Sequence, residues 1–145
     1  MRSMTAALTF SHPVRIYWED TDTDAGGVVF YANYLKFFER ARTEWLRSLG
    51  LAQQRLRDEE GLVFVVTDSQ LRYVQPARLD DELTVRVTIA EAARATLTLA
   101  QSALRGSTLL VEGRIGLACV EAATLRPRRL PKTLLDALAS QPITP

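Results

Sequence analysis

The sequence has only one cysteine, Cys119, and one histidine, His12, among its 145 residues. A single cysteine cannot form an intramolecular disulfide, which excludes the framework of a small secreted protein and favours a reducing, cytoplasmic compartment. One histidine and one cysteine also cannot supply a usual zinc ligand set. His12 lies at the start of the first predicted strand, where we expect a partly exposed polar residue and not the base of a nucleophilic triad.

Other features are missing as well. The amino terminus has no apolar stretch of signal-peptide length, and no window reaches the roughly 18–20 apolar residues that a membrane span needs. The net charge of +1 argues against nucleic-acid binding, which normally requires a basic excess. Because 47% of the residues are hydrophobic, a real core is expected. We predict one domain over residues 1–145, with flexible ends at about 1–12 and 140–145.

A long amphipathic helix is predicted over residues 31–49. Its apolar residues recur at three- and four-residue steps, at Tyr34, Phe37, Ala41, Trp45 and Leu49. Gly50 comes next, where a helix carboxyl end favours glycine. Shorter helices are predicted at 52–59 and at 132–139.

The remaining periodicity is that of strands. We predict a short strand at 14–18 and a continuous apolar one from 62 that turns to alternation and ends before Pro76. Further strands are expected at 83–89, 96–104 and 109–120, with a tight turn at 105–107. One strand, one long helix and four antiparallel strands make an α+β fold, in which the helix covers one face of a curved sheet.

An acidic loop precedes the long helix. It contains Asp20, Asp22 and Asp24 at alternate positions and ends in Gly26 and Gly27. An EF-hand would need glycine at the sixth position and glutamate at the twelfth, and counting from Asp20 these positions hold alanine and tyrosine. Glycine-rich phosphate loops of either common pattern are absent. We therefore predict no metal site here.

A carboxylate beside a glycine pair that opens a helix is suited to acyl transfer. Helix amino ends leave N–H groups unpaired and can stabilise the oxyanion of a tetrahedral intermediate. The carboxylate can attack a carbonyl or deprotonate water. The same residues also suit a simpler role, in which the aspartates cap the helix and solvate the loop. The residues alone leave both interpretations open.

A resemblance to a known family adds weight to the catalytic interpretation. Residues 14–35, VRIYWEDTDTDAGGVVFYANYL, resemble the signature of the 4-hydroxybenzoyl-CoA thioesterase family. They are most similar to the branch found with the bacterial Tol–Pal envelope system. Weaker similarities occur at 38–44, 73–81 and 127–132. The resemblance implies a hotdog fold, with a five-stranded antiparallel sheet wrapped around one long central helix and active sites at a dimer interface.

The resemblance also implies roles for individual residues. The family's catalytic aspartate immediately precedes the small residue and glycine of the loop, which corresponds to Asp24. Its oxyanion donor is a backbone N–H that corresponds to Tyr31, and Gly26, Gly27 and Val28 are expected to lie against the substrate.

The sequence departs from the branch at two points. The loop is two residues longer, so that counting from the strand selects Asp22 and counting back from the glycines selects Asp24. We favour Asp24, since the geometry of the site depends on the helix start and a loop absorbs insertions. Many members also have histidine where Tyr31 stands, which puts turnover or substrate preference in doubt.

A basic cluster near the carboxyl terminus suits the phosphates of coenzyme A. It consists of Arg126, Arg128, Arg129 and Lys132. A solvated surface stretch is the alternative interpretation. Glu39 is a second carboxylate of interest, since some hotdog thioesterases use a helical glutamate in place of the loop aspartate. We expect it instead to pair with Arg42 or Arg15, or to be satisfied near the interface between protomers. The aromatic residues Phe37, Phe38 and Trp45 are expected in the core, and Cys119 is expected to be an inert strand residue.

The predicted function is hydrolysis of an acyl-CoA or acyl-carrier-protein thioester to acid and thiol, with coenzyme A as part of the substrate and no cofactor. A hydratase on the same fold would need a well-placed histidine. The other rival is a non-catalytic acyl-CoA binder or envelope-system interaction protein. We expect a homodimer or homotetramer, because one helix leaves much of a five-stranded sheet uncovered and exposed strand edges favour pairing.

Overall fold

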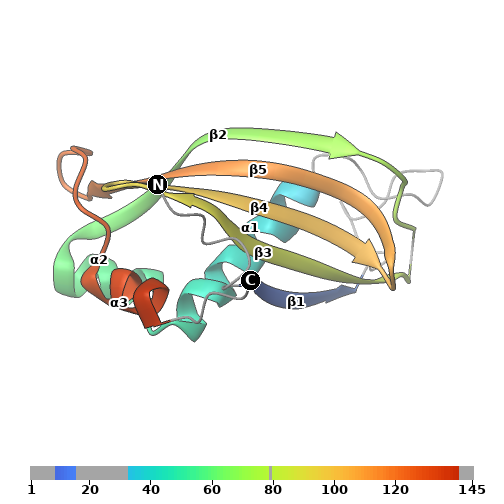
Figure 1. Ribbon diagram of the computed structural model, residues 1–145, viewed down its shortest axis with the longest axis horizontal. Coiled ribbons are helices and arrows are strands. Elements are labelled where there is room, and N and C mark those ends of the chain that lie inside the picture. Colours follow the sequence, from blue (N-terminus) through green and yellow to red (C-terminus); the bar gives the residue numbers. More distant parts are fainter. Residues whose placement is uncertain (1–8, 16–32, 79, 141–145) are drawn as a thin grey trace.

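The computed structural model describes residues 9–15, 33–78 and 80–140. In this part of the chain five strands form one antiparallel sheet in the order β1-β3-β4-β5-β2. The longest helix, α1, crosses one face of the sheet, and the two shorter helices lie together at one end of it (Figure 1). We call the face that packs against α1 the inner face and the opposite one the outer face.

The elements have these bounds: β1 Thr9–Arg15, α1 Asn33–Ser48, α2 Gln53–Glu60, β2 Leu62–Tyr73, β3 Glu82–Ala92, β4 Thr96–Arg105, β5 Thr108–Glu121 and α3 Lys132–Ser140.

Alternation along the strands separates the two faces of the sheet. In β3 the side chains of Leu83, Val85, Val87 and Ile89 are at most 1% exposed, and the residues between them face the other way. The inner face and the apolar side of α1 together form the core. The predicted core aromatics are all buried in it, which confirms that prediction.

Helix α1 is amphipathic and packs mainly on β1, β3 and β4. It ends where predicted, and Gly50 comes after it with a φ of 80°, a left-handed conformation that glycine adopts without steric cost. Because α1 is centred on one half of the sheet, the inner face of β2 is less covered. Val66 is 50% exposed there and Tyr73 is 46% exposed.

Two glycines of β5 lie close to the neighbouring strand β2. A Cβ atom on Gly113 would meet the backbone oxygen of Gln70 at 2.5 Å, and also the side chain of Leu71. At Gly116 the obstacles are side-chain atoms, the end of Asp68 and the hydroxyl of Thr67, and both side chains are exposed and can move. The two positions therefore differ in how well they tolerate a side chain.

Most predicted elements are confirmed, with shifts at their ends. The first strand begins at Thr9, five residues before the predicted start, because it pairs with β3 over seven residues. A two-residue turn after Arg105 joins β4 to β5, with Gly106 at a φ of 59°. The five-stranded antiparallel sheet is as predicted, but the helical part of the described chain comprises three helices and not one central helix alone.

Within the described residues, no helix is long and apolar enough to cross a bilayer.

Candidate active site

The predicted catalytic loop lies outside the described residues. This applies to Asp24 and Tyr31, to the predicted substrate contacts Gly26, Gly27 and Val28, and to the alternative carboxylate Asp22. Their roles therefore stay predictions. The structure does describe the helix α1 that comes directly after this loop, beginning with Asn33.

Tyr34 fixes the amino end of α1 to the end of β2. Its side chain is 2% exposed, and its hydroxyl oxygen accepts a hydrogen bond of 3.0 Å from the backbone N–H of Ala77. Its ring lies 5.8 Å from that of Tyr73, the last residue of β2, and meets Phe37 edge-on at 5.9 Å. The start of α1 is therefore held at the carboxyl end of β2.

The environment of Tyr34 opposes loss of its proton. Burial is the largest cause and raises the pKa of the phenol, and the charge of Asp81 adds to this. The N–H of Ala77 and the charge of Arg105 act in the opposite direction but do not overcome burial. Tyr34 is thus a neutral structural anchor beside the predicted site.

Asn33 is a residue that the sequence reasoning missed. It is 8% exposed, and its Nδ2 atom is buried without a hydrogen-bond partner in the described part of the chain. An unpaired buried donor is costly, so its presence calls for an explanation. It stands in the first turn of α1, where backbone N–H groups are also unpaired. Nothing in the sequence pattern distinguished this asparagine, since its burial depends on tertiary packing.

A buried polar group lies at the middle of α1. Arg42 is 8% exposed and donates through Nη1 to Oε1 of Gln101 at 2.8 Å, while Nε2 of Gln101 donates to the carbonyl oxygen of Phe38 at 3.0 Å. Burial lowers the pKa of Arg42, and the charge of Glu39 opposes this. Arg42 and Glu39 both line a cavity of about 190 Å³ between α1 and the inner face of β5 and β2.

The predicted ion pairs of Glu39 are not formed. Arg42 and Arg15 are both described, and neither comes within 4 Å of the Glu39 carboxylate. These two pairings were wrong, because Arg42 turns into the protein toward Gln101 and Glu39 stays exposed. The alternative, that Glu39 is satisfied near the interface between protomers, stays a prediction.

The predicted phosphate-binding cluster lies at the other end of β2. Ala122 donates to the carbonyl of Gly61, just before β2 begins, and Arg128 donates its backbone N–H to Cys119, which pairs with Phe64. Tyr34 stands at the far end, beside Tyr73. The twelve residues of the strand make eleven steps of about 3.3 Å, so an extended strand separates its two ends by about 36 Å.

The cluster itself is exposed and basic. Nη1 of Arg128 forms an ion pair of 2.6 Å with Glu121. The charged groups of Arg126, Arg129 and Lys132 have no carboxylate within 4 Å in the described part of the chain. These three cations are thus free to bind an anionic ligand. Within one chain, however, they lie far from the start of α1.

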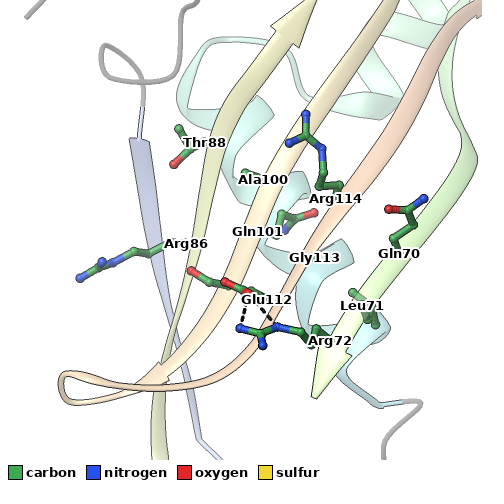
Figure 2. A pocket seen from close by; sticks show the side chains of 11 residues that line it. Gln70, Leu71, Arg72, Arg86, Thr88, Ala100, Gln101, Glu112, Gly113 and Arg114 are labelled. Carbon is green, nitrogen blue, oxygen red and sulfur yellow. Dashed lines mark hydrogen bonds and ion pairs between the residues drawn. The ribbon is translucent and has the colours of Figure 1, made fainter. Parts of the chain in front are cut away.

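A hollow of about 730 Å³ lies on the outer face and holds none of the predicted site residues. Figure 2 shows the ion pair between Arg72 of β2 and Glu112 of β5, with Arg86 and Arg114 also lining the hollow. Charged, polar and aliphatic side chains line it together, and the helix α1 runs behind the strands. This face therefore does not border the amino end of α1.

Two other predictions are tested by the described residues. His12 is partly exposed, as predicted. Cys119 is fully buried in β5, and burial raises the pKa of its thiol, so it is the inert residue that was predicted. No group of three or more His, Cys, Asp or Glu side chains that could hold a metal occurs in the ranges that the structure describes.

Comparison with known proteins gives the family. A model described as the thioesterase-like superfamily matches residues 17–138. This chain belongs to that superfamily. The predicted family and the predicted enzyme class, a thioesterase, are thereby confirmed.

Relatives agree over nearly the whole chain. The acyl-CoA thioesterase YbgC of Haemophilus influenzae is 46% identical over 128 residues, which is 88% of this chain and 93% of that protein. The acyl-CoA thioester hydrolase YbgC of Escherichia coli O6:H1 is 42% identical and covers 87% of this chain and 92% of its own. Among solved structures, a probable thioesterase from Bartonella henselae has a TM-score of 0.80 and 35% identity, covering 86% of this chain and all of that one. The predicted hotdog-like fold, a five-stranded antiparallel sheet with helices, is shared with this structure.

Proposed function

We propose that this protein hydrolyses acyl-CoA thioesters to a free acid and coenzyme A. The observation that carries the proposal is the 46% identity with an acyl-CoA thioesterase over 88% of the chain. The loop sequence from Asp24 to Gly27 adds support, since it contains the carboxylate and the glycine pair that the reaction needs before a helix.

In the proposed reaction Asp24 acts on the thioester carbonyl. A carboxylate with a reference pKa of about 3.9 is ionised at neutral pH. It attacks the carbonyl carbon to give an acyl anhydride that water then hydrolyses, or it takes a proton from the attacking water. In either route the carbonyl oxygen becomes negative, and the N–H of Tyr31 together with the dipole of α1 stabilises it.

Asn33 is a further donor for this reaction. Its Nδ2 has no partner in the described part of the chain and lies in the first turn of α1. A bound thioester would supply the missing acceptor, which accounts for keeping a costly unpaired donor in that position. This favours a role for Asn33 in holding the substrate.

The coenzyme A phosphates are proposed to meet the basic cluster that includes Arg126, Arg129 and Lys132. Guanidinium groups bind phosphates through two parallel hydrogen bonds, and these three cations have no carboxylate partner in the described chain. An acyl-carrier-protein thioester would present the same acyl group and thiol arm, so it is the second proposed substrate class.

The experiment is steady-state release of free thiol from a panel of short, long and aromatic acyl-CoAs. Wild type should turn over part of the panel, and Asp24→Asn should fold and assemble normally while losing at least about a hundredfold in kcat. Calorimetric binding of the same acyl-CoAs without any thiol release would instead support the non-catalytic binder. The tyrosine at position 31, where the branch often has histidine, is the feature that makes this second outcome worth testing.

A further inference from the structure

The hollow on the outer face of the sheet has no part in the proposed reaction. Helix α1 packs on the inner face, so the strands separate the start of α1 from this hollow (Figure 2). Its volume of about 730 Å³ falls within the range of roughly 300–1,000 Å³ that is usual for small-molecule sites. The hollow therefore has room for a second ligand.

Small residues of β4 form the floor of the hollow. Ala100 and Ser102 point outward, because the residues that alternate with them along the strand are buried. Ser102 lies opposite Arg86 of β3 on one side and Glu112 of β5 on the other. Ala100 lies opposite Arg114 of β5. Longer side chains on β3 and β5 thus stand on both sides of a low strip of β4, as Figure 2 shows.

The lining of the hollow is positively charged. It includes the three arginines Arg72, Arg86 and Arg114 and one carboxylate, that of Glu112. Arg72 forms an ion pair of 2.7 Å with Glu112. No carboxylate of the described chain lies within 4 Å of the charged groups of Arg86 or Arg114. Two positive charges are thus left without a partner, which suits a dianion.

Other acidic residues of the outer face do not neutralise these two arginines. Asp68 of β2 and Glu91 of β3 lie further along the strands and do not line the hollow. Neither forms an ion pair with Arg86 or Arg114. The positive charge of the hollow is therefore available to a ligand.

The spacing of the two arginines suits one small anion. They are separated by two strand spacings of about 4.8 Å across the sheet and two residues of about 3.4 Å along it, so their Cα atoms are about 12 Å apart. Both side chains are exposed and can turn toward a ligand over Ala100. The hydroxyl of Ser102 forms no hydrogen bond within the described residues and can donate to the same ligand.

We propose that the outer-face hollow binds a small molecule with a phosphate or diphosphate group, held by Arg86 and Arg114 above Ala100 and Ser102. Guanidinium groups bind phosphate oxygens through two parallel hydrogen bonds, and arginine keeps its charge at any physiological pH. This site is separate from the proposed thioester site, and neither depends on the other.

Isothermal titration calorimetry with inorganic pyrophosphate tests the proposal. The basic cluster near the carboxyl terminus can bind the same anion, so the titrations use a background chain with Arg126→Gln, Arg129→Gln and Lys132→Gln. This chain should bind pyrophosphate. Inorganic phosphate, titrated at the same ionic strength, shows which of the two groups the hollow prefers, and binding of either supports the proposal.

Pairs of substitutions in this background locate the binding. Arg86→Gln with Arg114→Gln should weaken the affinity for pyrophosphate at least about tenfold, since each arginine supplies charged hydrogen bonds. Arg57→Gln with Arg94→Gln is the matched control. It removes two other exposed arginines without a carboxylate within 4 Å in the described chain, and it should change the affinity less than about threefold.

A further variant separates a shaped site from diffuse positive charge. Ala100→Leu fills the floor of the hollow and leaves both arginines in place, and a thermal unfolding scan checks that its fold is kept. It should also weaken the affinity for pyrophosphate at least about tenfold. In an NMR titration of the background chain, the backbone amide signals of Ala100 and Ser102 should shift as pyrophosphate is added.

Several results would overturn the proposal. They are binding of neither anion by the background chain, equal losses in the arginine pair and the control pair, and full affinity in Ala100→Leu. A change in oligomer mass on replacement of Arg86 and Arg114, measured by light scattering without added anion, would also overturn it, because a second copy of the chain would then occupy this face.

Discussion

Replacement of Gln101 by leucine should destabilise the protein by removing the partner of a buried charge. Gln101 is 2% exposed and accepts the only hydrogen bond that the Arg42 side chain donates in the described chain. Gln101 in turn donates to the carbonyl oxygen of Phe38 and so links Arg42 to the backbone of α1. Hydrogen bonds to charged groups contribute about 1.5–3 kcal/mol, and the unpaired guanidinium adds a desolvation cost. We expect a loss of about 2–4 kcal/mol in the free energy of unfolding, with a fall in Tm of roughly 5–12 °C.

Urea unfolding at pH 7 and fixed protein concentration measures this, since stability of an oligomer depends on concentration. Arg42→Met alone should also destabilise, because it leaves the Gln101 oxygen buried without a donor. The double variant Arg42→Met/Gln101→Leu should lose less free energy of unfolding than the sum of the two single losses, since it leaves neither a buried charge nor a buried amide without a partner. Gln70→Leu, at an exposed outer-face glutamine, is the control and should stay within about 0.5 kcal/mol. Strict additivity of the two core substitutions would refute the reasoning.

Three further outcomes are expected at other described residues. Tyr34→Phe leaves the buried N–H of Ala77 without an acceptor and should cost about 1–3 kcal/mol in urea unfolding at pH 7. Burial raises the pKa of Tyr34 in the folded state, so its neutral phenol contributes stability that is full below about pH 10 and is lost as pH rises through the raised pKa. Tyr34→Phe should therefore flatten the fall in the free energy of unfolding above about pH 10. An unchanged slope of the free energy of unfolding against pH would contradict this. Gly113→Ala should lower the free energy of unfolding by about 1–3 kcal/mol, because the new Cβ atom would meet the backbone of β2. Gly116→Ala should lower it by clearly less, because there the new Cβ atom would meet side chains that can move. Equal losses in the two variants would argue against the packing described. Asn33→Ala should leave Tm unchanged or higher while kcat/KM falls about tenfold or more, and a parallel loss of both would mean that its role is structural.

The fold was largely predictable because its local signals agree with one another. The three- and four-residue spacing from Tyr34 to Trp45 and the alternation of Leu83 to Ile89 each predict the element that forms. The start of β1 was not predictable, since Thr9 joins the sheet through pairing with Thr88 on a strand far along the chain.

The arrangement of the candidate site residues was not predictable from the sequence. The resemblance points to Asp24, and the charge pattern suggests a basic cluster that suits phosphates. Only the path of β2 reveals that the cluster lies at the opposite end of the strand from the start of α1. The burial of Asn33 and the turn of Arg42 toward Gln101 depend on contacts between distant segments. Sequence spacing within one element carries no information about such contacts.

A comparison of Asp24→Asn with Asp22→Asn in one thiol-release assay shows whether Asp24, in the loop before α1, carries out thioester hydrolysis. Both variants change one carboxylate to its amide in the same loop, so each serves as the other's control. We expect kcat for the best acyl-CoA to fall at least about a hundredfold in Asp24→Asn and to change less than about threefold in Asp22→Asn. Activity near that of wild type in Asp24→Asn would contradict it.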